Sequence, residues 1–174
     1  MNSDFIKLRL LDYYNTPTDI LIPNYYVGGY EADVYKISKA GITTEFEIKI
    51  SKSDFKVDFS KGFIKYDGTT INKHDLISQG KRTNKFYFVV PEGLILKEEV
   101  PEYAGLIYCT KEGYLKVIKN SKLLHKGSHF EKDPNLYEKL LGNLLFRERN
   151  ASRALRNAKN YIKELENKLH GKNN

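Results

Sequence analysis

Residues 43–50, Thr-Thr-Glu-Phe-Glu-Ile-Lys-Ile, alternate strictly between polar and apolar side chains after the second threonine. Side chains along a β-strand point alternately to opposite faces, so this segment predicts a strand with two chemically different faces. One face carries Phe46, Ile48 and Ile50, and the other carries Glu45, Glu47 and Lys49. Residues 30–37 predict a second strand, and the short turn at 39–41 suggests that the two strands pair as a hairpin.

The remaining pattern predicts an α/β fold with a central mixed sheet flanked by helices. A capped first helix is expected over 4–14, further strands over 19–27, 85–90, 106–109 and 114–118, and short helices over 73–79 and 98–103. Residues 57–72 are polar and rich in glycine and threonine, which favours an insertion or mobile loop containing a small hairpin around Asp67-Gly68.

From residue 135 onward the sequence becomes helical. Apolar side chains recur every seven residues along two rows that form one seam, which is typical of a long helix packing on a partner helix. We therefore expect residues 1–130 to form the main domain, 131–170 a helical extension and 171–174 a frayed tail. The outer face of this helix is basic. The simpler interpretation is a solvated face over an apolar seam; the alternatives are contact with the DNA backbone or dimerisation along the seam. The seam consists of Leu144, Ala151, Leu155, Ala158, Ile162, Leu165 and Leu169.

Composition narrows the class of protein. The 174 residues carry a formal net charge of +7, which favours polyanionic partners such as DNA. The single cysteine, Cys109, excludes a disulfide within the chain and favours a reduced, cytoplasmic protein. No apolar run is long enough to span a membrane, and the first residues lack the features of a signal peptide.

Asp33, Glu47 and Lys49 form the candidate site. If the strands over 30–37 and 43–50 pair as a hairpin, Asp33 lies beside Glu47, and Lys49 leaves the same face as Glu47 because it is two residues further on. Two carboxylates suit a hard divalent cation such as Mg²⁺ or Mn²⁺, and a lysine can orient water or stabilise charge during phosphodiester hydrolysis. The alternative is a half-exposed strand whose polar face is simply solvated.

Several blocks in this order resemble the PD-(D/E)XK nuclease superfamily, and more narrowly the MmcB-like group of proposed DNA-repair nucleases. The blocks are Ala32-Asp33, then Glu45-Phe-Glu-Ile-Lys-Ile-Ser-Lys-Ser-Asp-Phe55, then Phe86-Tyr-Phe-Val-Val-Pro-Glu-Gly-Leu94 and Pro101-Glu-Tyr-Ala-Gly-Leu-Ile107. The resemblance extends from about residue 30 to residue 118. It implies a restriction-endonuclease-like core around the mixed sheet.

The resemblance also implies roles for individual residues. Asp33 and Glu47 would be metal ligands, with the Ile48 carbonyl as an additional one, and Lys49 would be the catalytic lysine. Many relatives carry a glutamate on the first helix, where Asp12 is the nearest acidic residue of this chain. Secondary candidates are Glu45 and Ser51 on the same strand face, Asp12, and Lys73, which with His74 resembles a Lys-His pair of some relatives. Taken alone, His74 is expected at the surface.

Three functional hypotheses follow. The first is a Mg²⁺- or Mn²⁺-dependent nuclease that hydrolyses DNA phosphodiester bonds in repair, recombination or processing. The second is a DNA-binding accessory protein whose nuclease site is weak or inactive, which the missing glutamate on the first helix favours. The third is an interaction module that uses the C-terminal seam and binds no DNA.

Overall fold

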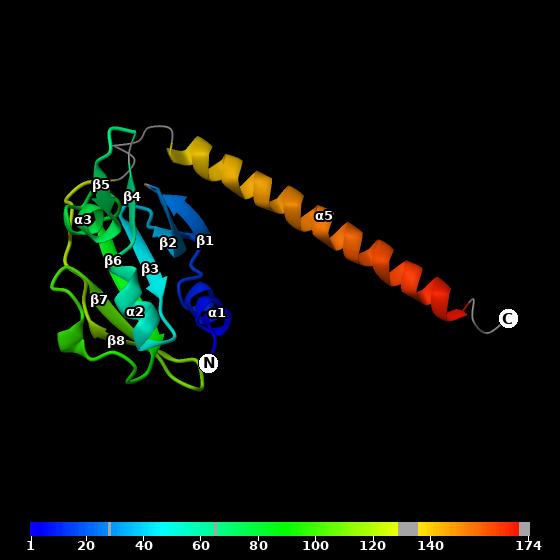
Figure 1. Ribbon diagram of the computed structural model, residues 1–174, viewed down its shortest axis with the longest axis horizontal. Helices are drawn as coiled ribbons and strands as arrows, with labels where there is room; N and C mark the ends of the chain where they lie inside the picture. The colour runs from blue at the N-terminus through cyan, green and yellow to red at the C-terminus, as the bar shows by residue number, and fades with distance from the viewer. Residues whose placement is uncertain (28, 65, 129–135, 171–174) are drawn as a thin grey trace. The chain divides into compact units, whose positions relative to one another are not determined.

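The computed structural model describes residues 1–27, 29–64, 66–128 and 136–170, and it divides the chain into two compact units, 1–132 and 133–174. The first unit is a mixed six-stranded sheet flanked by helices (Figure 1), and the second contains one long helix, so the predicted α/β class is confirmed. The predicted frayed tail, 171–174, lies outside the described residues.

The strand order in the sheet is β1-β2-β3-β6-β7-β8. Neighbouring strands are antiparallel except at the centre, where β3 pairs parallel to β6 and β6 parallel to β7. A separate two-stranded sheet consists of β4 and β5. The strands are β1 (Ile20–Val27), β2 (Tyr30–Ile37), β3 (Thr43–Ile48), β4 (Gly62–Ile64), β5 (Thr70–Asn72), β6 (Lys85–Pro91), β7 (Gly105–Cys109) and β8 (Leu115–Lys119).

Helices contribute to the two cores of the first unit. The core that includes α1 packs Ile6 and Leu10 against Val34, Phe46 and Ile48. The other includes Phe55 of α2 and Ile77 of α3, which pack with Phe86 and Phe88 of β6. The helices are α1 (Ser3–Tyr13), α2 (Lys52–Asp58), α3 (Lys73–Ser78) and the 3-10 helix η1 (Lys97–Glu99), so the helical turn expected over 98–103 is shorter and begins earlier.

The strand that carries the candidate site is buried on both faces. Every residue of β3 is buried, because the strand lies inside the sheet: Phe46 and Ile48 belong to the core that includes α1, whereas Glu45 contacts buried Arg82 and Glu47 contacts Lys73 of α3. The alternative of a half-exposed strand with a solvated polar face is therefore wrong. Two glutamates in a buried strand need partners, since an unpaired buried charge is costly.

The second unit contains α5 (Leu136–His170), a helix of 35 residues. Leu144, Leu155, Ile162 and Leu165 of the predicted seam have between 40% and 59% of their surface exposed. The side chain of Leu169 lies outside the described residues. No described helix is long and apolar enough to cross a membrane.

Candidate active site

Asp33 and Glu47 lie where β2 and β3 begin to separate. The last backbone pair in the ladder is Val34 with Phe46, and one further step of this register places Asp33 opposite Glu47. Beyond that pair, the Ile48 N–H donates to Asp33 Oδ2 at 2.8 Å. The Asp33 side chain thus accepts a hydrogen bond where a backbone carbonyl would accept it in a continued ladder. The two carboxylates thus come from adjacent strands, as the hairpin prediction required.

The Lys49 amine lies between carboxylates. Its Nζ donates to Glu47 Oε1 and to Asp58 Oδ1, both at 2.9 Å, and lies 3.5 Å from Asp54 Oδ1. Lys49 is only 2% exposed, and its backbone N–H continues the parallel pairing of β3 with β6 by donating to Val89 O. The amine is therefore held both by its ion pairs and by the sheet.

Asp58 is the centre of the charged cluster. This fully buried carboxylate, at the end of α2, accepts from Lys49 on one oxygen and lies 2.8 Å from His74 Nε2 on the other. Lys61 Nζ is 2.7 Å from Asp58 Oδ1, and Lys73 Nζ is 3.5 Å from Oδ2. Asp58 thus faces three amines and an imidazole, and β3, α2, α3 and the segment before β4 meet at it.

A histidine and a tyrosine extend the cluster away from the lysines. His74 Nδ1 lies 2.6 Å from the Tyr103 hydroxyl, while the imidazole packs against the rings of Phe59 and Phe88. His74 is only 7% exposed, so the prediction that it is a surface residue is wrong. Its two ring nitrogens are both engaged, which fixes the imidazole plane relative to Asp58.

These surroundings set the protonation of Asp58 and Lys49. Burial raises the pKa of Asp58, but the His74 hydrogen bond and the Lys73 and Lys49 amines outweigh it and hold that pKa far below its usual range. Burial lowers the pKa of Lys49, but the Glu47 and Asp58 carboxylates outweigh it and raise that pKa above its usual value. Lys49 is therefore a cation at neutral pH, which suits stabilising negative charge better than accepting a proton.

Asp33 behaves in the opposite way. Burial and the neighbouring Glu47 carboxylate raise the pKa of Asp33, although the Ile48 N–H and Lys7 act against them. Lys7, on α1, has its Nζ 3.9 Å from Asp33 Oδ1 and donates to Asn24 Oδ1. The first helix thus presents a cation to Asp33 rather than a carboxylate.

We expect Asp33→Asn to raise the melting temperature near neutral pH. The melting temperature of the variant should also decrease less steeply as pH rises. A carboxyl whose pKa is raised in the folded state binds protons more tightly there than in the unfolded chain. Stability therefore falls as pH rises from the usual carboxyl value through the raised one. Asparagine carries no charge and still accepts from Ile48 N–H. Calorimetry across pH checks this against Glu31→Gln, an exposed carboxylate on the same strand; an unchanged pH slope in Asp33→Asn would contradict it.

Oxygen atoms of the candidate site are the groups that a Mg²⁺-type cation would use. Glu47 Oε2 is buried and accepts no hydrogen bond, because Lys73 Nζ, although 2.8 Å away, is not aligned for one. Within the described part of the chain no three His, Cys, Asp or Glu side chains converge as a metal site. Mg²⁺ is commonly held by one or two carboxylates together with water and substrate phosphates, so Asp33, Glu47 and the Ile48 carbonyl are the groups that could hold it here.

The secondary candidates have different positions. Lys73 lies in the cluster, with its Nζ near both Glu47 and Asp58. Glu45 instead forms a two-point ion pair with buried Arg82, at 2.9 and 3.1 Å, on the same face of β3. Ser51 is the N-cap of α2, where its Oγ accepts from Asp54 N–H, and Asp12 is paired with Arg9 at the surface. Glu45, Ser51 and Asp12 therefore contact residues outside the charged cluster or cap a helix, and Lys73 is the secondary candidate that lies in the cluster.

The residues that sequence reasoning missed are Asp58, His74, Lys61 and Tyr103. One signal for Asp58 was available: it follows Asp54 by four residues on a helix capped by Ser51, so both carboxylates share one helix face. For His74 the Lys-His pair was the one signal and for Tyr103 there was none, because their contacts join positions 16 and 29 residues apart.

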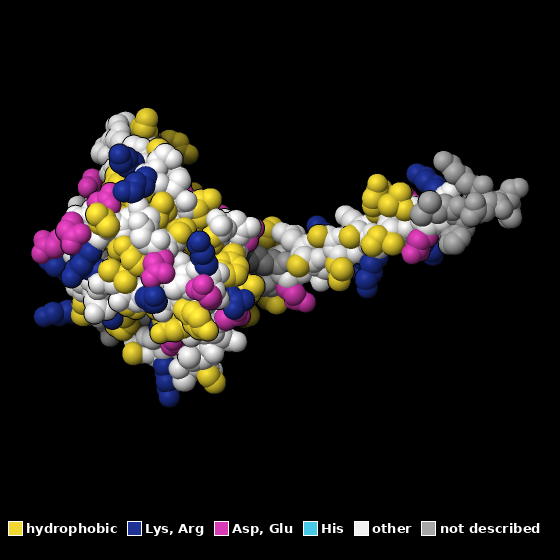
Figure 2. Space-filling view, turned by 90° about the horizontal axis from the view of Figure 1, so that it is seen from below, with side chains coloured by type: hydrophobic (Ala, Val, Ile, Leu, Met, Phe, Trp, Pro, Cys, Tyr) yellow, Lys and Arg dark blue, Asp and Glu magenta, His cyan; other side chains and the backbone are white. Residues whose placement is uncertain are grey.

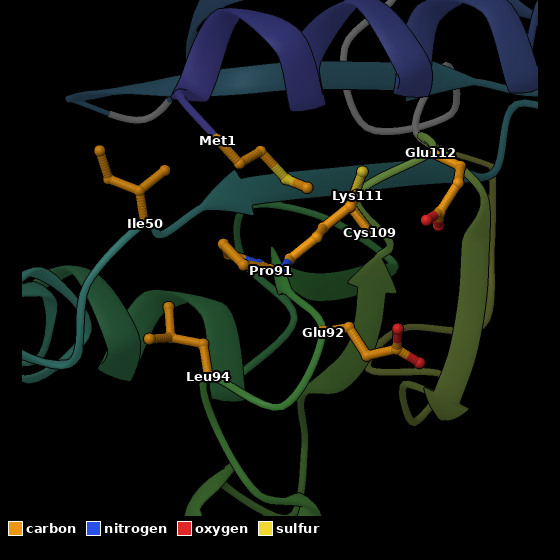
Figure 3. Close-up of a pocket in the computed structure, with 8 residues that line it drawn as sticks. All are labelled: Met1, Ile50, Pro91, Glu92, Leu94, Cys109, Lys111 and Glu112. Carbon is orange, nitrogen blue, oxygen red and sulfur yellow. The ribbon is translucent and has the colours of Figure 1, made fainter.

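A separate pocket of about 420 Å³ opens near the ends of β6 and β7 (Figure 3). Its lining is mixed, with apolar side chains beside Glu92, Lys111 and Glu112, and it includes none of the residues of the charged cluster. The lining is Met1, Ile50, Pro91, Glu92, Leu94, Cys109, Lys111 and Glu112. This hollow is thus distinct from the candidate active site.

Comparison with known proteins supports the fold and goes no further. Neither the family models nor the curated proteins match this sequence. Among solved structures, the SPO1766 protein of unknown function from Silicibacter pomeroyi is similar, with a TM-score of 0.55 over 87% of each chain and 14% sequence identity. The first unit therefore defines an α/β protein with a mixed six-stranded sheet and a buried carboxylate–lysine cluster.

Proposed function

We propose that the first unit is a Mg²⁺- or Mn²⁺-dependent nuclease that hydrolyses phosphodiester bonds of DNA, in repair, recombination or processing. The observation that carries this proposal is the meeting of Asp33, Glu47 and Lys49 at one end of the β2–β3 pair. The resemblance to MmcB-like and other PD-(D/E)XK proteins supports DNA as the substrate.

Each residue has a defined part in this chemistry. Asp33, Glu47 and the Ile48 carbonyl would hold the cation, which when bound polarises the phosphate and lowers the pKa of the attacking water. Lys49, held as a cation by Glu47 and Asp58, would stabilise the negative charge that builds on the phosphate. Asp58 and His74 would keep the Lys49 amine in place rather than touch the substrate.

The first test is a cleavage assay on supercoiled, linear, single-stranded and branched DNA, with Mg²⁺, with Mn²⁺ and with EDTA. We expect metal-dependent cutting by the wild-type protein that disappears in Asp33→Ala and persists in Glu31→Ala. The control is matched because Glu31 is an exposed acid on the same strand. The proposal fails if no DNA is cut, or if cutting survives both EDTA and the loss of Asp33.

A second candidate is a DNA-binding accessory protein with a weak or inactive nuclease site. Lys7 favours it, because an amine 3.9 Å from Asp33 competes with a cation for that carboxylate. So do the Lys49 and Lys73 amines, which already lie 2.9 and 2.8 Å from the two oxygens of Glu47. Binding of DNA without cutting in the assay above would support this candidate.

We also propose that α5 pairs with α5 of a second copy along the heptad seam. On the helix, Figure 2 shows hydrophobic side chains exposed beside basic ones, and Leu155 and Ile162 are each more than half exposed. We expect Leu155→Lys with Ile162→Lys to convert a dimer to a monomer in sedimentation equilibrium, since both changes place charge in the seam. Asn160→Lys is the control on the outer face; a wild-type monomer contradicts the proposal.

A further inference from the structure

The β4–β5 hairpin is anchored firmly at its base. Lys73 N–H donates to Lys61 O at 3.0 Å and so closes the two strands together. Asn72 Nδ2 donates to Phe59 O at 2.8 Å, and the Tyr30 hydroxyl donates to Ile71 O at 3.1 Å. A two-stranded sheet is only marginally stable alone, so these contacts with α2 and β2 fix where the hairpin points.

The far end of the hairpin exposes apolar side chains. Figure 1 shows β4 and β5 reaching past the end of the six-stranded sheet. Ile64 is 73% exposed and Tyr66 is fully exposed. The turn itself is defined by other residues: Gly68 has a φ of +79°, and Asp67 Oδ1 accepts from Thr69 N–H at 2.9 Å. Neither the turn nor the core therefore requires an isoleucine and a tyrosine here.

The base of the same hairpin belongs to the charged cluster. Lys61 precedes β4 and Lys73 follows β5, and their amines lie 2.7 and 3.5 Å from the Asp58 carboxylate. Lys61 and Tyr66 are five positions apart in the chain, so they can lie at most roughly 17 Å apart, the length of about five nucleotides of a DNA strand. The site and the exposed tip are thus two ends of one anchored element.

We propose that the hairpin tip binds unpaired bases, so that the preferred substrate is DNA with a single-stranded segment, such as a fork, flap or gap. The inference rests on the proposed function. An exposed aromatic ring stacks on a base whose face is free, whereas in a duplex those faces are already stacked. Charge favours the same ligand: the chain carries a formal net charge of +7, which attracts the phosphate backbone of DNA.

The test measures DNA binding in EDTA, where binding is read without cleavage. Fluorescence anisotropy compares a labelled single strand, a fully paired duplex and a fork with unpaired arms. We expect Tyr66→Ala to weaken binding of the fork and the single strand about tenfold and to leave the duplex unchanged, while Tyr66→Phe keeps the ring and the affinity. Tyr114→Ala is the matched control, because Tyr114 is 70% exposed outside the hairpin. Both tyrosines lie at the surface, so the variants retain the wild-type melting temperature.

The proposal is overturned if wild-type protein binds none of the three DNAs, if Tyr66→Ala changes none of the affinities, or if it weakens the duplex and the fork equally. It is also overturned if Tyr114→Ala has the same effect. Cleavage with Mg²⁺ is scored separately on the same DNAs. Tyr66-dependent binding without any cleavage refutes the nuclease alone, whereas cleavage with Tyr66-independent binding refutes the hairpin's role alone.

Discussion

Asp58→Asn is expected to destabilise the protein by roughly 3–5 kcal/mol near neutral pH, the range for breaking a buried ion pair by removing one partner. The variant leaves the amines of Lys49, Lys61 and Lys73 facing Glu47 without their second carboxylate. It also removes the anion that His74 Nε2 contacts. Urea denaturation followed by circular dichroism measures the change.

The control for Asp58 lies on the same helix. Asp54 is also near Lys49, at 3.5 Å, but its side chain is 45% exposed, so Asp54→Asn should cost less than about 1 kcal/mol. The pH dependence gives a second check. Because the pKa of Asp58 is held far below its usual value, its contribution is fully present above the ordinary carboxyl value and is lost only as pH falls toward the depressed one. If Asp58→Asn and Asp54→Asn lowered the free energy of unfolding equally, the cluster would not be a buried network.

Lys49→Met should reduce the rate of DNA cleavage on the order of 10²- to 10³-fold, the effect of removing one donor that stabilises charge in a transition state. Methionine has a similar volume and no charge, so the fall should be in kcat, with DNA affinity in EDTA nearly unchanged. Lys49→Arg keeps the charge but not the compact geometry between Glu47 and Asp58, and we expect it to recover part of the rate.

Lys49 is buried, so its replacement also removes one cationic partner from each of Glu47 and Asp58 and lowers the stability of the folded protein. The kinetic comparison is therefore made well below the melting temperature of each variant. Lys52→Met, three residues further along and 55% exposed, is the control and should cleave at the wild-type rate. A Lys49→Met protein that is folded and cleaves normally would remove Lys49 from the mechanism.

The sequence predicted the part of the site that depends on local spacing. Alternation over residues 43–50 placed Glu47 and Lys49 on one strand face, and a short hairpin connection brought Asp33 to the neighbouring strand. Alternation could not separate Glu45 from Glu47, because the two are chemically identical and two residues apart. Arg82 separates them in the structure, since it pairs with Glu45 from a position 37 residues away.

The same limit explains the cluster behind the strand. Asp58 comes from the end of a short helix and His74 from the start of another, and the hairpin β4–β5 lies between them. Neither position has a repeat or spacing that points to the other. The prediction of a polar insertion over 57–72 therefore included Asp58, whose spacing from Asp54 was the one local sign of its role, while its partners come from tertiary contacts.

The parallel pairing of β3 with β6 has a consequence for how the protein folds. It places Glu47 beside Phe88, 41 residues later, and the helices that carry Asp58 and His74 lie in the connection between the two strands. Closing such a loop lowers the entropy of the chain before the contacts between the strands can stabilise it, so non-local parallel pairing is slow. The carboxylate–lysine cluster should therefore form only once this strand pair is registered, so that the proposed metal-dependent cleavage would return at the last stage of folding, rather than the first, after dilution from denaturant.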